Sequence, residues 1–369
     1  MTDPNTSFFI GVDDFYDIYS DIYTELNYTE QGHNNNSFVV DESTLQCDQA
    51  TFSHAVNVAA CVFYAVVFAL AVPGNVVVGL VIGSKRRLLS TSDVYLFHLM
   101  VADIVLALCL PFHAVSMLRG WLFGNVICKL VSVMKEVSFY TSILFLVCIS
   151  IDRYQVIVRA MEVRQGKWRL GSCVVCLIVW VLGVGLSLPA LHFEAYVPPN
   201  SSEMVCAEHY ETESSDKWRV ATRALRHLLG FLLPLAVMLC CYGVTVARLL
   251  RTQGFRRQRA MRVIVAVVAG FLLCWVPYHV AMIADTLLRA KAVSYSCRTR
   301  TAVTVALFAT QSLGLLHCCV NPVLYAFVGQ KFRSNLVRLL YKKGVLDRGS
   351  LSRVSRSTSQ TSEHPSTVL

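Results

Sequence analysis

Seven long apolar stretches alternate with short polar connections along the 369-residue sequence. Each is long enough to cross the roughly 30 Å hydrocarbon core of a bilayer as a helix. The stretches cover residues 54–83, 93–118, 126–158, 170–193, 220–249, 259–288 and 301–328. Four contain interior segments without any Asp, Glu, Lys or Arg, and these lack the charged face of a soluble amphipathic helix. The second and third are weaker in hydropathy because they hold Asp103, and Lys129, Lys135 and Glu136. The pattern predicts an all-α membrane protein with a seven-transmembrane helix bundle.

Lys and Arg are unevenly divided between the two sets of connections. Fourteen lie within 85–87, 153–169 and 248–262, and seven lie in the connections on the opposite side. Because basic residues favour the cytoplasmic side, this bias predicts a multi-pass protein of the cell membrane with an extracellular N-terminus and a cytoplasmic C-terminus. All N-glycosylation acceptor sequences fall on the predicted outer side, which supports that orientation. Their acceptor residues are Asn5, Asn27, Asn35 and Asn200.

The net charge of +9 is the sum of two parts of opposite sign. Residues 1–50 contain ten acidic side chains and no Lys or Arg, whereas the cytoplasmic loops and tail are basic. The basic excess therefore indicates topology, and no nucleic-acid partner is predicted. The acidic arm, with its interleaved tyrosines, is interpreted as disordered, either a solubilising tail or a docking strip for a basic protein. Its candidate ligand-binding residues are Asp13, Asp14, Tyr16, Asp17, Tyr19, Asp21 and Tyr23.

The fourteen cysteines separate into two groups. Ten lie inside the apolar stretches and are interpreted as buried thiols, because none is accompanied by the further ligands that a zinc site needs. The other four lie on the outer side, where the environment is oxidising and disulfides form. Spacing alone leaves three pairings open among them. They are Cys47, Cys128, Cys206 and Cys297.

Polar and helix-breaking residues recur in order along the apolar stretches, where such residues are costly and therefore informative. They are Asn75, Asp103, Asp152-Arg153-Tyr154, Trp180, Pro234, Cys274-Trp275-Val276-Pro277 and Asn321-Pro322-Val323-Leu324-Tyr325. This ordered set resembles the rhodopsin-like G-protein-coupled receptors over about residues 50–340. Further segments resemble the CXC chemokine receptors of the interleukin-8-receptor type. These segments are 129–153, 284–287, 316–322 and 329–333.

The resemblance implies a disulfide pairing and a set of residues that carry activation. The implied disulfides are Cys128 with Cys206 and Cys47 with Cys297. In this family Trp275 repacks beside a proline kink, and the released arginine of the third span meets the G protein. The implied activation and G-protein contact residues are Asp152, Arg153, Tyr154, Tyr242, Trp275, Pro277, Asn321, Pro322 and Tyr325.

Asp103 with Ser142 resembles the family's allosteric sodium pocket, which favours the inactive state. The alternative is that Asp103 is a hydrogen-bonded packing residue. No other cofactor is expected. Catalysis is not expected either, because no nucleophile, base and orienting group lie together in the sequence.

Receptors of the interleukin-8 type engage a Glu-Leu-Arg motif at the ligand's N-terminus with pocket residues of both signs. The resemblance places Arg223 and Arg300 at the basic positions and Asp285 at the acidic one. The alternative for the two arginines is that they snorkel to the membrane interface. Gln311 stands where most chemokine receptors carry glutamate, so a charge pairing is lost there. Lys135 stands where amine receptors carry an aspartate, which excludes a counter-ion for a cationic amine.

Four segments are predicted along the chain. Residues 1–50 form the acidic extracellular arm, 51–328 the seven-transmembrane bundle, 329–342 an amphipathic membrane-surface helix and 343–369 a Ser/Thr-rich cytoplasmic tail. Phosphorylation by receptor kinases would turn this basic tail into an anionic arrestin-binding segment. The last residues resemble a ligand for a PDZ protein, which would bury the carboxylate of Leu369. A plain disordered end is the alternative.

The favoured function is a receptor for CXC chemokines of the Glu-Leu-Arg type that couples to Gi and drives leukocyte or neutrophil chemotaxis and calcium signalling. The alternative is a scavenging, atypical chemokine receptor that internalises its ligand without G-protein signalling. Gln155 and Val156 depart from the family pattern after Tyr154, but Arg153 is retained, which favours signalling. A transporter is disfavoured because the sequence has no internal repeat or pair of broken half-helices.

Overall fold

The structure is a computed structural model. It describes residues 52–84, 89–159, 167–198, 201–210, 215–250, 255–290, 292–293, 296–328 and 330–342. The chain divides into two units, residues 1–46 and 47–369, and all described residues belong to the second. Side chains are described over most of these ranges, with the exceptions 167–170, 215–216, 249–250, 255–264, 267, 325–328, 330–333 and 342.

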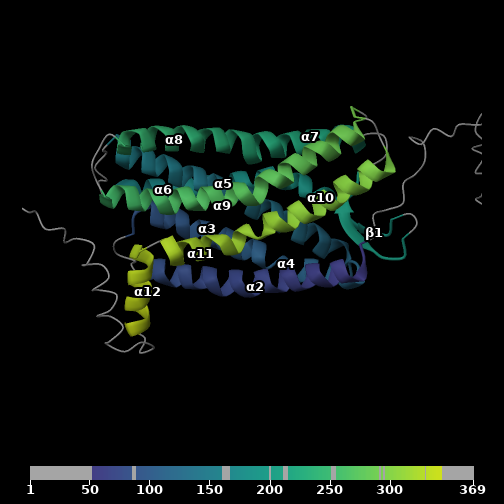
Figure 1. Cartoon of the computed structure of the whole chain (residues 1–369), viewed down its shortest axis with the longest axis horizontal. Coiled ribbons are helices and arrows are strands. Elements are labelled where there is room, and N and C mark those ends of the chain that lie inside the picture. Colours follow the sequence, from purple (N-terminus) through teal and green to yellow (C-terminus); the bar gives the residue numbers. More distant parts are fainter. Residues whose placement is uncertain are drawn as a thin grey trace, which may run out of the picture. The chain divides into compact units, whose positions relative to one another are not determined.

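Helices make up nearly all of the described chain (Figure 1). The first half contains α2 (His54–Gly83), α3 (Thr91–Ala107), α4 (Leu110–Arg119), α5 (Gly124–Val158), α6 (Lys167–Leu186) and the 3₁₀ turn η1 (Leu188–His192). A two-stranded antiparallel hairpin follows, with β1 (Phe193–Tyr196) and β2 (Val205–Glu208). The second half contains α7 (Ser215–His227), the π turn η2 (Leu228–Leu232), α8 (Leu233–Leu250), α9 (Phe255–Arg289), α10 (Cys297–Leu315), α11 (His317–Val328) and α12 (Gln330–Lys342).

Within the described residues, seven segments are long and apolar enough to cross a membrane, which confirms the predicted fold. They are His54–Gly83, Thr91–Arg119, Gly124–Val158, Gly171–His192, Lys217–Arg248, Val268–Arg289 and Cys297–Leu324. Their outward faces carry large apolar side chains, such as Leu177 at 64% and Leu273 at 73% exposure. Such faces are stable against lipid and would be unfavourable in water.

The third span, α5, lies in the interior of the bundle. It packs against α3, α6 and α8. Phe139 and Ile143 on one face of this helix and Phe145 on another are all fully buried. A helix that is buried on most sides tolerates polar residues only when they have partners. The charged residues that weakened its hydropathy therefore indicate polar contacts inside the bundle.

Several spans contain a proline, which removes a backbone N–H donor. The second span is broken between α3 and α4, where Pro111 occupies the first turn of α4. Pro234 follows the π turn η2, because a proline at this position offers no N–H to the carbonyl of Gly230 four residues earlier. Pro322 likewise leaves the carbonyl of Cys318 without its helical donor. Hydropathy alone does not reveal these breaks, because the flanking residues are apolar.

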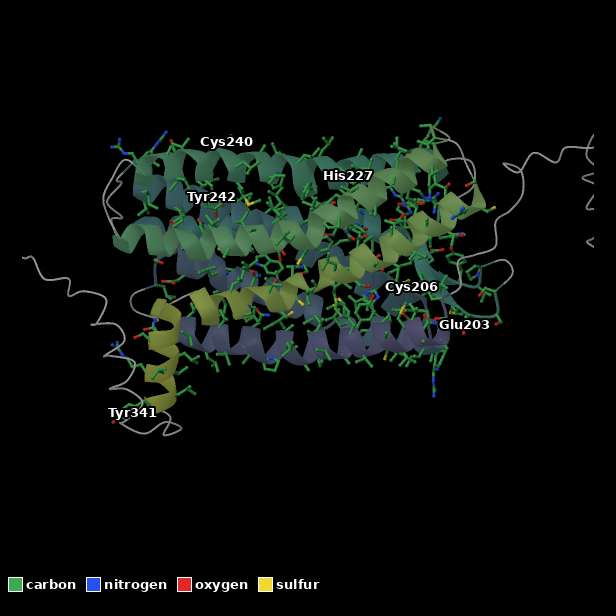
Figure 2. The ribbon with its side chains drawn as sticks, viewed as in Figure 1. Glu203, Cys206, His227, Cys240, Tyr242 and Tyr341 are labelled. Atoms are coloured by element: carbon green, nitrogen blue, oxygen red, sulfur yellow. A yellow bond between two sulfur atoms is a disulfide. The ribbon has the colours of Figure 1, made fainter. Side chains whose placement is uncertain are left out.

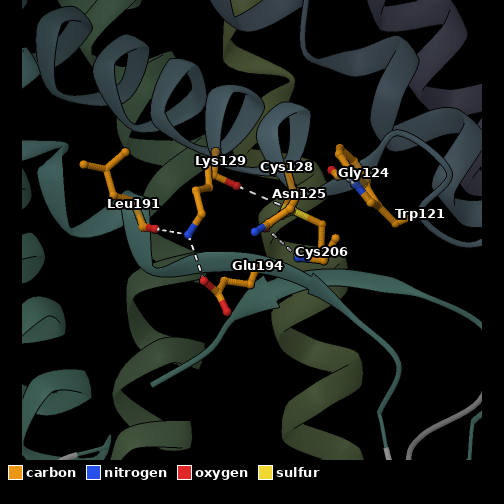
Figure 3. Close-up of a disulfide and its surroundings, with 10 residues drawn as sticks. Trp121, Gly124, Asn125, Cys128, Lys129, Leu191, Glu194 and Cys206 are labelled. Carbon is orange, nitrogen blue, oxygen red and sulfur yellow. Dashed lines mark hydrogen bonds and ion pairs between the residues drawn. A yellow bond between two sulfur atoms is a disulfide. The ribbon is translucent and has the colours of Figure 1, made fainter. Parts of the chain in front are cut away.

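The outer hairpin is fastened to the third span by a disulfide. Cys206 on β2 is bonded to Cys128 near the start of α5, which confirms the implied pairing (Figure 3). Lys129 adds a second attachment, since its Nζ donates to the Leu191 carbonyl at 2.7 Å and pairs with Glu194 Oε1 at 3.0 Å. This hydrogen bond from Lys129 lowers the pKa of the Glu194 carboxyl.

The remaining cysteines follow the predicted division. Cys297 is disulfide-bonded, and Cys47, which the resemblance pairs with it, lies outside the described residues. Among the described residues the free cysteines are the ten that lie in the apolar spans, and five of them are buried. The ten are Cys61, Cys109, Cys148, Cys173, Cys176, Cys240, Cys241, Cys274, Cys318 and Cys319. The interpretation as buried thiols is wrong for Cys173 and Cys240, which are exposed. No metal-binding group of three or more His, Cys, Asp or Glu side chains occurs in the described part of the chain.

The helix after the seventh span changes direction. In Figure 1, α12 crosses the end of the bundle at a steep angle to α11. Its bounds, Gln330–Lys342, fall within the range 329–342 in which a membrane-surface helix is predicted. The tail beyond it lies outside the described residues, as do the acidic arm and Asn200.

Candidate functional site

A narrow cleft of about 30 Å³ lies under the outer hairpin, between α5, α7 and α9. Its wall contains acidic and basic side chains together with aromatic ones. Among them are Glu136, Tyr140, Glu208, Tyr210, Arg223 and Arg226. Burial raises the pKa of Tyr210, so its hydroxyl remains a neutral hydrogen-bonding group at physiological pH. The cleft wall therefore presents charges of both signs to a group that enters it.

Three arginines converge on one buried carboxylate at the edge of this cleft. Asp285 is 1% exposed, and its Oδ2 lies 2.8 Å from Arg223 Nη1 and 2.8 Å from Arg289 Nε. Arg300 Nη1 lies 3.2 Å from Asp285 Oδ1. The predicted residues Arg223, Asp285 and Arg300 are thus brought together, from α7, α9 and α10. Arg289, which sequence reasoning did not select, completes the group and leaves it with two more positive than negative charges.

Arg223 is directed to the buried Asp285 carboxylate and does not snorkel to the membrane interface. Its side chain is 11% exposed and also donates to Thr286 Oγ1 at 2.9 Å. Gln311, the fourth predicted pocket residue, is half-buried on α10. The sequence could have revealed Arg289 through its spacing from Asp285, because the two residues are four positions apart, about one helical turn.

A second ion pair lies deeper in the same cleft. Arg226 Nη1 on α7 lies 2.8 Å from Glu136 Oε1 on α5. The guanidinium also faces the rings of Phe139, at 5.1 Å, and Tyr278, at 5.3 Å. Sequence reasoning did not select either member of this pair, because ninety positions separate them and no short motif contains both.

The centre of the bundle holds Trp275, one of the predicted switch residues. It is 2% exposed and packs against Phe139 with ring centroids 4.6 Å apart. Its Nε1 lies 3.3 Å from His317 Nδ1. A Cβ added at Gly314 would meet the Trp275 ring at 3.0 Å, so the seventh span approaches the ring closely. Pro277, also predicted, lies inside α9 just beyond Trp275.

Asp103 is fully buried and is connected to this tryptophan through His317. Its Oδ2 accepts a hydrogen bond from Asn321 Nδ2 at 2.7 Å, and His317 Nε2 lies 3.4 Å from its Oδ1. Neither Asp103 Oδ1 nor Ser142 Oγ has a hydrogen-bond partner among the described residues, although both atoms are buried. Oxygen is the preferred ligand of small hard cations, so each of these two atoms is chemically suited to be a ligand of such an ion.

The inner end of the third span carries the predicted acid–arginine pair. Arg153 Nε lies 3.7 Å from Asp152 Oδ2, and Asp152 also accepts a hydrogen bond from Ser92 on α3. Tyr242 on α8 (Figure 2) bonds Ser150 Oγ at 2.8 Å. Asp152 therefore pairs with Arg153, and Ser150, about one helical turn before Arg153 on α5, bonds Tyr242. Tyr154, the residue after Arg153 on α5, is half-buried. The side chain of Tyr325 is not among those described.

The sequence was compared with those of known proteins. Residues 74–325 match the 7 transmembrane receptor (rhodopsin family). The sequence is 45% identical to C-X-C chemokine receptor type 1 of Oryctolagus cuniculus over 83% of this chain and 86% of that protein. It is 46% identical to C-X-C chemokine receptor type 1 of Homo sapiens over 81% of this chain and 85% of that protein. It is 45% identical to C-X-C chemokine receptor type 2 of Bos taurus over 84% of this chain and 86% of that protein.

Proposed function

Because the chain belongs to the rhodopsin family of seven-transmembrane receptors, and within it to the CXC chemokine receptors, we propose that Glu-Leu-Arg chemokines activate it and that it signals through Gi. This family is a class of multi-pass membrane receptors and not a class of enzymes. The cellular result is chemotaxis of leukocytes, of the neutrophil type, with calcium release. The extracellular arm and the cytoplasmic tail keep the orientation that the distribution of basic residues predicts.

The convergence of Arg223, Arg289 and Arg300 on Asp285 is the observation that carries the choice of ligand. A glutamate of the ligand would be attracted by the excess positive charge, and an arginine of the ligand would compete for the Asp285 carboxylate. Charge-assisted contacts of this kind are strongest where water is excluded, and Asp285 is almost fully buried. The acidic arm would steer a basic chemokine toward this site, and sulfation of its tyrosines would strengthen that attraction.

Signal transfer follows the buried chain of aromatic contacts. Movement at the cleft reaches Phe139, which packs on Trp275, and Trp275 lies beside the proline kink of α9. Opening of the inner ends would free Arg153 from Asp152 for the G protein. Asp103 and Ser142 would hold a sodium ion that favours the inactive packing. Exchange of NaCl for choline chloride tests this ion, because agonist affinity should rise in the wild type and stay constant in Asp103→Asn.

Arrestin and receptor kinases are the further partners proposed for the Ser/Thr-rich tail, and a PDZ protein is proposed for Leu369. These segments lie outside the described residues, so the proposal depends on their sequence alone. Truncation after residue 342 should abolish arrestin recruitment while leaving chemokine binding within about twofold.

The experiment that tests the function compares binding, internalisation and signalling in cells that express the full chain. CXC chemokines with Glu-Leu-Arg should bind and inhibit cAMP formation, and pertussis toxin should remove this inhibition. Chemokines without Glu-Leu-Arg should be weak ligands. Binding and internalisation without a toxin-sensitive signal would reject Gi coupling and support the scavenging alternative.

A further inference from the structure

Arg226 and Glu136 form a pair of opposite charges at the inner wall of the cleft. The Arg226 side chain is 11% exposed and that of Glu136 is 7% exposed. They come from different helices, α7 and α5, so this contact joins two spans across the cleft. Removing two charges from water is costly, and the attraction between them compensates only when both are well hydrogen-bonded.

The pair does not satisfy all of its polar atoms. Arg226 Nη1 lies 2.8 Å from Glu136 Oε1, which is close enough for an ion pair. Nevertheless, neither Glu136 Oε1 nor Arg226 Nε makes an aligned hydrogen bond with any described residue, and both atoms are buried. A guanidinium has five N–H donors in a planar fork that suits a carboxylate at two points. Arg226 therefore has donor capacity that the present contact with Glu136 does not use.

Arg226 also lies on the face of α7 that carries a residue already placed in the ligand site. Arg223 precedes it by three positions, so the two arginines are neighbours on one helix face. Both line the cleft. Arg223 is directed to Asp285 and Thr286, whereas Arg226 is directed to Glu136. A chain entering the cleft would meet the Asp285 group first and Arg226 beneath it.

The guanidinium of Arg226 contacts the rings that surround the central tryptophan. It lies 5.1 Å from the centroid of Phe139 and 5.3 Å from that of Tyr278. Phe139 packs on Trp275 at 4.6 Å, and Tyr278 packs on Trp275 at 5.7 Å in an edge-on arrangement. Arg226 therefore contacts two rings that both pack on Trp275.

From this arrangement we propose that Arg226 is a carboxylate-binding residue for the entering ligand, and that Glu136 is its internal competitor. This inference rests on the proposed function and specifies where the glutamate of the Glu-Leu-Arg segment binds. Without ligand, Glu136 neutralises Arg226. The ligand's carboxylate replaces Glu136, accepts two parallel N–H hydrogen bonds from the guanidinium, and shifts Phe139 and Tyr278 against Trp275.

A double-mutant cycle on the full-length receptor in cell membranes tests the contact. The two ligands are a Glu-Leu-Arg chemokine that activates the wild type and the Glu→Gln variant of that chemokine. The binding of each ligand is measured on the wild-type receptor and on Arg226→Gln. Arg226→Gln should weaken binding of the unchanged chemokine by roughly tenfold or more, the size expected for a charged hydrogen bond. The same substitution should weaken binding of the Glu→Gln chemokine by less than about threefold. Equal losses for both chemokines would overturn the contact while leaving the proposed function standing.

Glu136→Gln separates competition from a structural role. If Glu136 competes with the ligand, its neutral variant should bind the unchanged chemokine several-fold more tightly. If the pair only stabilises the bundle, Glu136→Gln should weaken binding, and the competition is wrong. The double variant Glu136→Gln/Arg226→Gln leaves no buried unpaired charge. It can replace Arg226→Gln in the comparison of the two chemokines if Arg226→Gln alone is poorly expressed at the cell surface.

Arg219→Gln is the matched control, because Arg219 lies two turns earlier on α7 and faces Tyr210 at 5.8 Å. It should bind the two chemokines with the same ratio as the wild type. If no Glu-Leu-Arg chemokine binds the wild-type receptor, the proposed function and this inference are overturned together.

Discussion

The side-chain amide of Asn75 donates a hydrogen bond to the carbonyl oxygen of Cys318, 2.7 Å away. This is the carbonyl that Pro322 leaves without a donor, because a proline four residues later has no N–H. Asn75 also donates to the Ala71 carbonyl at 2.9 Å and is 1% exposed. A polar side chain in the first span thus compensates for a proline in the seventh and ties the two spans together.

Replacing Asn75 with Ala should destabilise the receptor by about 1–3 kcal/mol, because a buried carbonyl would lose its partner. The expected result is a lower midpoint of thermal unfolding for the purified receptor in detergent. Asn57→Ala on the same helix is the control, and it should shift the midpoint less. Equal midpoints for the wild type and Asn75→Ala would contradict this role of Asn75.

The disulfide between Cys128 and Cys206 should be required for the shape of the outer cleft. Because it attaches β2 to α5, Cys206→Ser should lower stability by about 2–4 kcal/mol and abolish high-affinity chemokine binding. Thermal unfolding and ligand displacement measure the two effects. Cys173→Ser, at a free and exposed cysteine, should change neither. Retained affinity in Cys206→Ser would show that the hairpin folds without this bond.

Neutralising Asp285 should weaken the ligand site more than neutralising an exposed acid. Asp285→Asn removes the shared partner of three arginines, which should cost about 2 kcal/mol of binding free energy, or roughly thirtyfold in affinity. Competition binding with a Glu-Leu-Arg chemokine measures this loss. Glu203→Gln, at an exposed position of the outer loop, should change affinity by less than about threefold. Similar losses in both variants would mean that Asp285 acts only through long-range charge.

Gly314 offers a direct test of the central tryptophan as a switch. A Cβ at this position would meet the Trp275 ring at 3.0 Å, so Gly314→Ala should hinder movement of the ring. The maximal chemokine-stimulated signal should fall to below about half, with affinity changed by less than about threefold, as measured by Gi activation beside ligand binding. Gly185→Ala is the control, because a Cβ there meets no atom within 4 Å. An undiminished signal in Gly314→Ala would exclude repacking of Trp275 as a necessary step.

The seven spans could be predicted from the sequence because length and lack of charge are local properties. The breaks at Leu108–Cys109 and at Leu316 could not, because the chain remains apolar across them. Asp285 and Arg223 were found through resemblance to a family motif. Their convergence with Arg289 depends on how helices are rotated in the bundle, which hydropathy does not specify.

Arg226 and Glu136 show the same limit more strongly. In the sequence, Glu136 only weakens the hydropathy of the third span, and Arg226 lies near the start of the fifth. The reason for both charges becomes visible only when α5 and α7 lie side by side and each charge meets the other. Charged residues within a span therefore indicate a polar site, but which residues they pair with depends on how the helices pack.

Nucleotide exchange on purified Gi tests the central claim most directly. The full-length receptor would be reconstituted in lipid nanodiscs, and exchange would be followed with and without a Glu-Leu-Arg CXC chemokine. We expect the chemokine to accelerate exchange at least several-fold, and Arg153→Ala to remove this acceleration without loss of chemokine binding. Chemokine that binds the wild-type receptor and leaves the exchange rate unchanged would contradict the account.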